Sequence, residues 1–292
     1  ALAPGKSTGA SRAEDAAFLA LMDSLGREYA RHYPIEATEL GIHDHDGEID
    51  DLSPAGIAAE TAWLGGWQRK LAAVQADRLS PALRFDLELS RHAIASRLFQ
   101  RGEIHDERVR PGLYLRLAAG SVNALIKRSF APPIVRLRSV LSRQAKLPAI
   151  LQVAEQNLGE GSRVAQISID ITLSDLDATA RFFSDDVPAA FPDVKDAVLL
   201  AELRKSSQTV ADSLRRFGDF LRKRRATASP NFALGDEAYR KRLWAIEMID
   251  TPLPQLLQQA ESELARLRAE FQKTAAQIDR KKSAEQVQLD MQ

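Results

Sequence analysis

Apolar residues recur at intervals of three and four along most of this 292-residue chain. That spacing places them on one face of successive α-helices, and it constrains the fold more than any other feature of the sequence. The first stripe predicts a helix that ends near Tyr33, because Pro34 disfavours helical geometry in the residue before it. Its members are Phe18, Met22, Leu25 and Tyr29. The sequence therefore predicts an all-α fold, an antiparallel helical bundle or array of about 9–11 helices.

Two further helices are predicted to begin with the same dipeptide. Ser53-Pro54 and Ser80-Pro81 each supply a hydroxyl N-cap and then a proline at the first helical position, where the missing N–H costs nothing. The apolar stripes that follow are Ile57, Leu64, Trp67, Leu71 and Val74 in the first, and Leu83, Leu87, Ile94 and Leu98 in the second. Both segments are expected to be amphipathic helices.

Prolines and two long stripes organise the rest of the chain. Pro111, Pro132-Pro133 and Pro148 predict boundaries between helices of about 12–18 residues, since proline interrupts a helix interior. The long stripes are Leu199, Leu203, Val210, Leu214, Phe217 and Leu221, and then Leu257, Leu264, Leu267, Phe271 and Ile278. They predict the clearest helices of the second half.

Residues 166–173 depart from the helical pattern. Apolar and polar residues alternate there, which is typical of a half-buried strand, and β-branched residues favour that state. The alternating residues are Ile167, Ile169, Ile171 and Leu173. Since no second run of comparable strength could pair with it, a helix held by tertiary packing and an irregular extended connection both stay open.

The composition excludes several classes of protein. The chain has no cysteine, so disulfides, thiol catalysis, Cys-ligated zinc and iron–sulfur clusters are excluded. Lys plus Arg (40) balance Asp plus Glu (40), and 45% of the residues are hydrophobic, so intrinsic disorder and electrostatic capture of nucleic acid are poor interpretations. No segment approaches the roughly 18–20 apolar residues of a membrane span.

Composition also suggests how the chain is divided. Residues 1–12 are small, polar and rich in Gly and Pro, which predicts a flexible leader. Residues 13–292 are expected to form one helical domain, with any subdivision near residues 159–166.

The chain begins at Ala1 without the basic start or apolar stretch of a signal peptide, so an export signal would lie upstream. The lack of thiols favours an oxidising bacterial compartment. We expect an extracytoplasmic protein, periplasmic or lipid-anchored after signal removal.

The densest cluster of metal-binding residue types follows the first helices. It comprises His43-Asp44-His45-Asp46, Glu48, Asp50 and Asp51. Two His residues separated by one position on an extended loop can face the same side, and carboxylates could complete a zinc or manganese shell. Gly41 and Gly47 flank the cluster, however, and an Asp/Gly-rich stretch is typical of a solvated loop between helices. The loop is the favoured interpretation, and no metal ligand is assigned.

Other candidate sites also have structural explanations. The sequence contains no His-Glu-x-x-His, no Gly-x-Ser-x-Gly and no phosphate-binding or dinucleotide fingerprint, so no catalytic residue is assigned. The basic run Arg222–Arg225, preceded by Arg215-Arg216, could contact phosphate or anionic lipid, but it also suits a helix C-terminus, where cations complement the dipole. Trp63, Trp67 and Trp244 lie on helical stripes and are expected to anchor a core or an interface.

Three segments, taken in order, carry a family resemblance. They are Tyr33–Gly41 (YPIEATELG), Leu137–Leu158 with its central Pro148, and Leu234–Tyr239 (LGDEAY) with the following helix to Phe271. Over about residues 15–290, the chain resembles the amino-terminal portion of the bacterial domain-of-unknown-function family 885. Members of that family are often exported or lipid-anchored, are typically twice this length, and resemble helical zinc metallopeptidases.

The resemblance implies an architecture and no chemistry for this chain. In the family, the metal-binding segment is a His-Glu pair followed by Pro-Gly-His-His, and it lies downstream of the matched region. The resemblance therefore assigns no catalytic residue and no metal ligand here, leaves substrate-binding residues unknown, and implies zinc only in a full-length parent. It also implies that Gln166–Leu173 is helical, and that this lobe forms one wall of a substrate channel.

Two hypotheses about function follow. In the first, the chain is the non-catalytic amino-terminal helical region of a metallopeptidase-like protein, its partner is the missing carboxy-terminal catalytic region, and an uncovered apolar face allows a homodimer to form. In the second, it is a free-standing exported helical protein that binds a peptide or another partner, because the polar tail from Arg280 to Gln292 resembles a natural chain end. Neither hypothesis involves nucleic acid or a membrane span.

Overall fold

A computed structural model describes residues 9–291 of the chain. Within them the fold is helical, and the single β contact is an isolated parallel bridge between Ala165 and Ser229. The predicted all-α class is confirmed. Of the predicted leader, residues 1–8 lie outside the described residues, and the first helix begins at Gly9.

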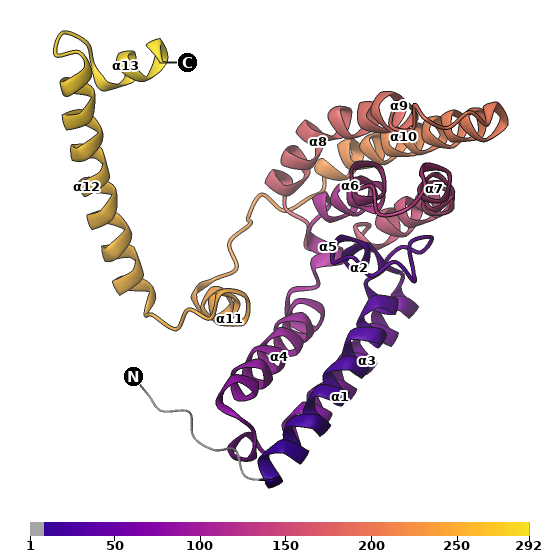
Figure 1. The fold of residues 1–292 in the computed structure, drawn as a ribbon. Helices are drawn as coiled ribbons and strands as arrows, with labels where there is room; N and C mark the ends of the chain where they lie inside the picture. The colour runs from indigo at the N-terminus through magenta and orange to yellow at the C-terminus, as the bar shows by residue number, and fades with distance from the viewer. Residues whose placement is uncertain (1–8, 292) are drawn as a thin grey trace. The chain divides into compact units, whose positions relative to one another are not determined.

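The chain forms two compact units, Ala1–Ala233 and Leu234–Gln292 (Figure 1). The helices of the first unit are α1 (Gly9–His32), α2 (Pro34–Glu39), α3 (Pro54–Ala72), α4 (Pro81–Phe99), α5 (Asp106–Val109), α6 (Gly112–Lys127), α7 (Pro133–Asn157), α8 (Gln166–Arg181), α9 (Val187–Ala189) and α10 (Ala197–Arg225). Three short helical turns lie between some of these helices. They are the 3₁₀ turn η1 (Ala76–Arg78) before α4, and the π-helical turns η2 (Gln100–Ile104) after α4 and η3 (Phe182–Asp186) after α8. The second unit contains α11 (Asp236–Glu247), α12 (Leu253–Ile278) and α13 (Ala284–Asp290).

Helices α1, α3 and α4 lie side by side and share one hydrophobic core (Figure 1). Its buried members are Phe18, Leu64, Trp67, Leu71, Leu79, Leu87 and Ile94. The indole N–H groups of Trp63 and Trp67 both donate to Oε2 of Glu28, at 2.7 and 2.8 Å. These two tryptophans are core anchors, as predicted, whereas Trp244 on α11 is half exposed.

A second and larger core joins α6, α7, α8 and α10. It includes Tyr114, Leu125, Leu137, Val140, Leu147, Ile169, Leu176, Leu203, Leu214 and Phe217. Gly218 lets α10 approach α8 closely, because a Cβ atom at that position would lie 2.3 Å from Cδ2 of Leu176. The predicted stripe from Leu199 to Leu221 lies on α10 and supplies most of that helix's contribution to this core.

The alternating segment at residues 166–173 is helical, as the family resemblance implies, and the strand that its alternation suggests is wrong. Burial follows the helical period, with Ile169, Thr172 and Leu176 facing the core. Ile167 and Ile171 are instead 45% and 58% exposed, so the alternation arises from apolar residues on the solvent side. Packing against α10 therefore outweighs the β propensity of isoleucine.

Two details of the helix boundaries differ between the prediction and the structure. Pro148 does not divide the middle region, because it lies inside the 25-residue helix α7. The buried residues Leu147, Ile150 and Leu151 continue the packed face on both sides of it. The free energy of this burial offsets the loss of the helix hydrogen bond that proline cannot make. Ser53 caps α3 by accepting from Gly56 N at 3.0 Å, whereas the side chain of Ser80 makes no capping bond to α4.

Candidate functional site

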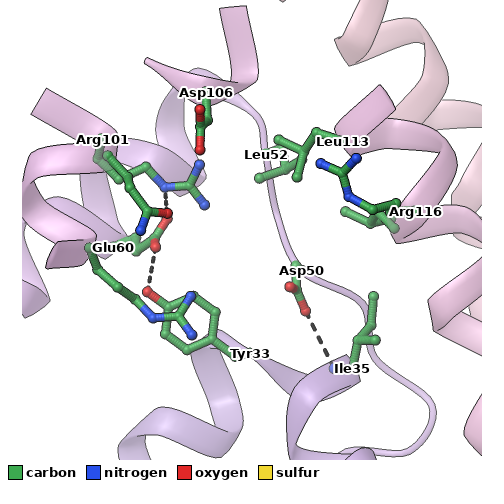
Figure 2. A pocket seen from close by; sticks show the side chains of 12 residues that line it. Tyr33, Ile35, Asp50, Leu52, Glu60, Arg101, Asp106, Leu113 and Arg116 are labelled. Atoms are coloured by element: carbon green, nitrogen blue, oxygen red, sulfur yellow. Dashed lines mark hydrogen bonds and ion pairs between the residues drawn. The ribbon is translucent and has the colours of Figure 1, made fainter. Parts of the chain in front are cut away.

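A pocket of about 240 Å³ lies in the first unit, where α2 and the loop before α3 meet α4, η2 and α6 (Figure 2). Ile35, Leu52, Leu113 and Leu117 supply apolar lining. Charged groups from several elements enter the same space, among them Arg101, Asp106 and Arg116. A small concave space with both apolar and charged lining is the usual form of a ligand site.

The segment Tyr33–Gly41, which carries part of the family resemblance, builds one side of this pocket. Pro34 opens α2 at a position where its missing N–H costs nothing. The helix ends at Glu39, Gly41 follows with a φ of +86° that suits glycine, and Ile42 N then donates back to Ala37 O at 2.8 Å. This short helix holds Tyr33 and Ile35 against the pocket.

Glu60 links the polar side chains on one side of the pocket, Tyr33 and Arg101, which together form its polar wall. It is 6% exposed, accepts a short hydrogen bond from the Tyr33 hydroxyl, and accepts from Nε of Arg101 at 2.7 Å (Figure 2). Glu107 adds a second carboxylate 3.5 Å from the same guanidinium. Burial alone would lower the pKa of Arg101, but the two carboxylates outweigh it and raise that pKa.

A second ion pair lies beside the first. Arg97 donates to Glu36 at 2.7 Å and to the Tyr29 hydroxyl at 2.5 Å, and its guanidinium lies 4.0 Å from the centre of the Tyr33 ring. Burial raises the pKa of Tyr33, because the ionised phenolate is disfavoured inside the protein and beside Glu60. Tyr33 therefore acts as a neutral donor.

Backbone geometry explains how Arg101 reaches this wall. The π-helical turn η2 follows α4 directly and contains Arg101. His105 then adopts φ 57° and ψ 55°, a left-handed conformation that is uncommon for a residue other than glycine. π-helical turns like η2 are frequent at functional sites.

Asp50 is a carboxylate of this pocket with a raised pKa. Its one hydrogen bond among the described residues comes from Ile35 N–H, at 3.4 Å (Figure 2). Burial raises the pKa of Asp50 to about 6, and the Ile35 amide and the positive charges of Arg97 and Arg143 only partly oppose that rise. Chemically, this group can exchange a proton or hold a cation under physiological conditions.

Arg116 enters from α6 on the other side of the pocket from Arg101 (Figure 2). Burial and the nearby charge of Arg110 lower its pKa, although a guanidinium stays charged at neutral pH. In residues 9–291, no hydrogen bond or ion pair engages its side chain.

The His/Asp cluster is a loop tied to the helices. His43 lies 3.1 Å from Asp46 and stacks on Phe130 with ring centroids 3.6 Å apart, while Glu48 pairs with Lys146 at 2.6 Å. Across the described part of the chain, no three His, Asp or Glu side chains are placed to hold a metal ion. Of the cluster, Asp50 alone lines the pocket.

The basic run Arg222–Arg225 ends α10, as predicted. Arg224 donates to the carbonyl oxygens of Leu158 and Ser162 at 3.0 and 3.1 Å, and Arg225 donates to Asp170 at 2.5 Å. These contacts tie the end of α10 to the loop before α8 and to α8 itself.

Sequence reasoning did not single out Glu60, Arg97, Arg101 or Arg116. Glu60 nevertheless carries a readable signal, because it falls within the apolar stripe from Ile57 to Leu71, at a position where a helix buries its residues. Arg101 similarly follows Leu87 and Ile94 at intervals of seven. A charge in a buried stripe needs a partner, so such positions point to a buried network.

Comparisons with known proteins agree with this fold. The family described as "Bacterial protein of unknown function (DUF885)" matches residues 34–291. A solved structure from Shewanella oneidensis, described as "a putative lipoprotein of unknown function", is similar with a TM-score of 0.73 and 20% sequence identity. The likeness covers 94% of this chain and 49% of that chain, so this chain spans about half the length of the solved structure that it matches. No curated protein matches the sequence.

Between Gly9 and Met291, every helix falls short of the length or the apolar content that a bilayer span requires.

Proposed function

This chain belongs to the DUF885 family of bacterial proteins, and we propose that it is the amino-terminal helical region of a longer, metallopeptidase-like member. In that protein it forms one wall of the substrate channel, and the carboxy-terminal region supplies the catalytic groups. The site described above then contributes substrate contacts and no bond-breaking step.

An uncovered apolar face on α12 carries this proposal. The predicted stripe lies on this helix, and within the second unit its side chains are 41–60% exposed. They are Leu257, Leu264, Leu267, Phe271 and Ile278. Soluble proteins rarely leave such a long apolar stripe in water, and surfaces between domains of one chain typically bury about 600–1,500 Å².

The occupant that we propose for this face is the carboxy-terminal region of the same polypeptide. The solved relative supports that choice, since this chain matches 49% of it and about half of that protein lies outside the match. A face on the amino-terminal half of a two-lobed enzyme would meet the other lobe.

The metallopeptidase likeness implies zinc, and the described residues do not fit a zinc site. His43 is engaged by Asp46 and Phe130, and no group of three or more His, Asp or Glu side chains within residues 9–291 converges on one point. The zinc site of the proposed full-length protein therefore lies outside residues 9–291.

We also propose an extracytoplasmic location. The chain has no cysteine, which suits an oxidising compartment, and the solved relative is described as a lipoprotein.

The experiment compares the 292-residue chain with the native protein from its source cells. Both are loaded with zinc, measured for bound metal per chain, and assayed with a mixture of peptides. We expect the 292-residue chain neither to hold stoichiometric zinc nor to cleave peptides, and the native protein to do both. Peptide cleavage by the 292-residue chain would contradict the proposal. A native protein without zinc or hydrolysis would favour the alternative, a free-standing exported helical binding protein.

A further inference from the structure

Most charged side chains of the pocket already have partners within the fold. The pairs are Glu60 with Arg101 at 2.7 Å, Arg97 with Glu36 at 2.7 Å and Asp106 with Arg110 at 3.3 Å. Because these charges neutralise one another locally, they contribute little to the binding of a charged ligand, which depends on other groups.

Two opposite charges of the pocket form no ion pair with any other described residue. Asp50 has one hydrogen bond in the described chain, a long one of 3.4 Å from Ile35 N–H, and the guanidinium of Arg116 has none there. Asp50 comes from the loop before α3 and Arg116 from α6, and both side chains line the same pocket (Figure 2). Asp50 is largely buried, and the positive charges of Arg97 and Arg143 offset the cost of that burial only partly, so the pocket favours an occupant that brings a cation into contact with this carboxylate.

We propose that this pocket binds a small zwitterion of amino-acid or dipeptide size, with its ammonium group on Asp50 and its carboxylate on Arg116. A guanidinium presents two parallel N–H donors that match a carboxylate, and a carboxylate accepts charge-assisted hydrogen bonds from an ammonium group. The ligand's aliphatic side chain packs on the wall formed by Ile35, Leu52 and Leu113.

The size of the pocket sets the size of the ligand. Its volume of about 240 Å³ falls below the range of about 300–1,000 Å³ that accommodates drug-sized molecules, and so limits the occupant to one or two residues. This inference rests on the pocket residues of this chain and does not depend on a longer parent protein.

The test is isothermal titration calorimetry on the 292-residue chain at neutral pH. L-leucine and L-leucyl-L-leucine are the two probes, because one is a free amino acid and the other a peptide with the same charges. N-acetyl-leucine lacks the ammonium group, and leucinamide lacks the carboxylate. The variants are Asp50→Asn and Arg116→Gln, with the exposed positions Asp193→Asn and Arg181→Gln as matched controls.

We expect at least one zwitterion to bind, and each pocket variant to weaken it by about tenfold or more, as the loss of one charge-assisted contact predicts. Binding of leucine assigns the site to free amino acids, whereas binding of the dipeptide alone assigns it to peptides. Asp50→Asn should abolish the preference for leucine over N-acetyl-leucine, and Arg116→Gln the preference for leucine over leucinamide.

Three results would overturn the inference. These are no heat of binding for either zwitterion at millimolar concentration, equal binding by the pocket variants and the wild type, and equal weakening by the control variants. Circular dichroism of every variant separates a lost contact from a lost fold, and Arg116 is exposed enough for its replacement to leave the core intact.

Discussion

The guanidinium of Arg143 on α7 donates a hydrogen bond to the carbonyl oxygen of Pro34, at 2.9 Å, although the two residues are 109 positions apart in the sequence. The same side chain is fully buried and donates to Ser121 O and to Thr38 Oγ1, each at 2.7 Å. One arginine therefore fixes α2 on α6 and α7, and α2 in turn positions the pocket residues Tyr33 and Ile35.

Replacement of this arginine should destabilise the first unit. Arg143→Met keeps an unbranched apolar stem but leaves Pro34 O, Ser121 O and Thr38 Oγ1 without the arginine as their donor, while it also removes a buried charge. We expect a net loss of about 2–4 kcal/mol in the free energy of unfolding, measured by urea denaturation. Arg138→Met, at an exposed position of the same helix, should change it by less than about 0.5 kcal/mol. Equal effects of the two changes would refute this role for Arg143.

Loss of Glu60 should also be costly. Glu60→Gln keeps the shape of the side chain but removes the charge that faces Arg101, whose side chain is only 14% exposed. We expect a loss of about 2–3 kcal/mol in unfolding free energy, against a negligible change for the exposed control Glu202→Gln. The double variant Glu60→Gln/Arg101→Gln should lose less than the sum of the single changes, since each removes the same interaction. Strict additivity would show that the pair is not coupled.

Asp50 should make the protein less stable as the pH rises. Its pKa of about 6 in the folded state exceeds the value of about 4 expected in the unfolded chain, so the folded state binds the proton more tightly. The stabilisation from that proton is complete below about pH 4 and is lost as the pH rises through 6. Asp50→Asn should then unfold with a free energy higher than wild type by about 2–3 kcal/mol at pH 7.5, with little difference at pH 4. A pH-independent difference would contradict the burial of an ionised Asp50.

The apolar face of α12 should make the isolated 292-residue chain self-associate. Leu264→Ser/Leu267→Ser should reduce concentration-dependent dimer formation in analytical ultracentrifugation, because the stripe loses its centre. Lys273→Ser lies toward the opposite side of the helix and should leave the association unchanged. A wild-type chain that stays monomeric at every concentration tested would argue against an interface at this face.

Helix positions could be predicted from the sequence because the information is local. A stripe such as Phe18 to Tyr29, or a Ser-Pro start such as Ser53-Pro54, determines an element from its own residues. The exceptions are positions where packing against another helix determines the local conformation. Pro148 is held inside α7, and the isoleucines of α8 follow a period of two in sequence while burial follows the helical period.

The pocket could not be predicted, because its pairs join distant segments. Glu60 and Arg101 are 41 residues apart. In the sequence Asp50 belongs to the Asp/Gly-rich stretch that is interpreted as a solvated loop, whereas its neighbours in space are Ile35 and Arg97. Charge alone does not reveal which partner a residue meets. Glu60, a carboxylate inside an apolar stripe, is the position at which the sequence signals a buried network.

The proposal that this chain is the amino-terminal half of a longer protein is tested most directly by the intact mass of the native protein in its source cells, with peptide coverage searched beyond Gln292. We expect a mass near twice 32.2 kDa, with downstream peptides that contain a His-Glu segment. A native mass near 32.2 kDa, with Gln292 as the last residue found, would contradict the proposal.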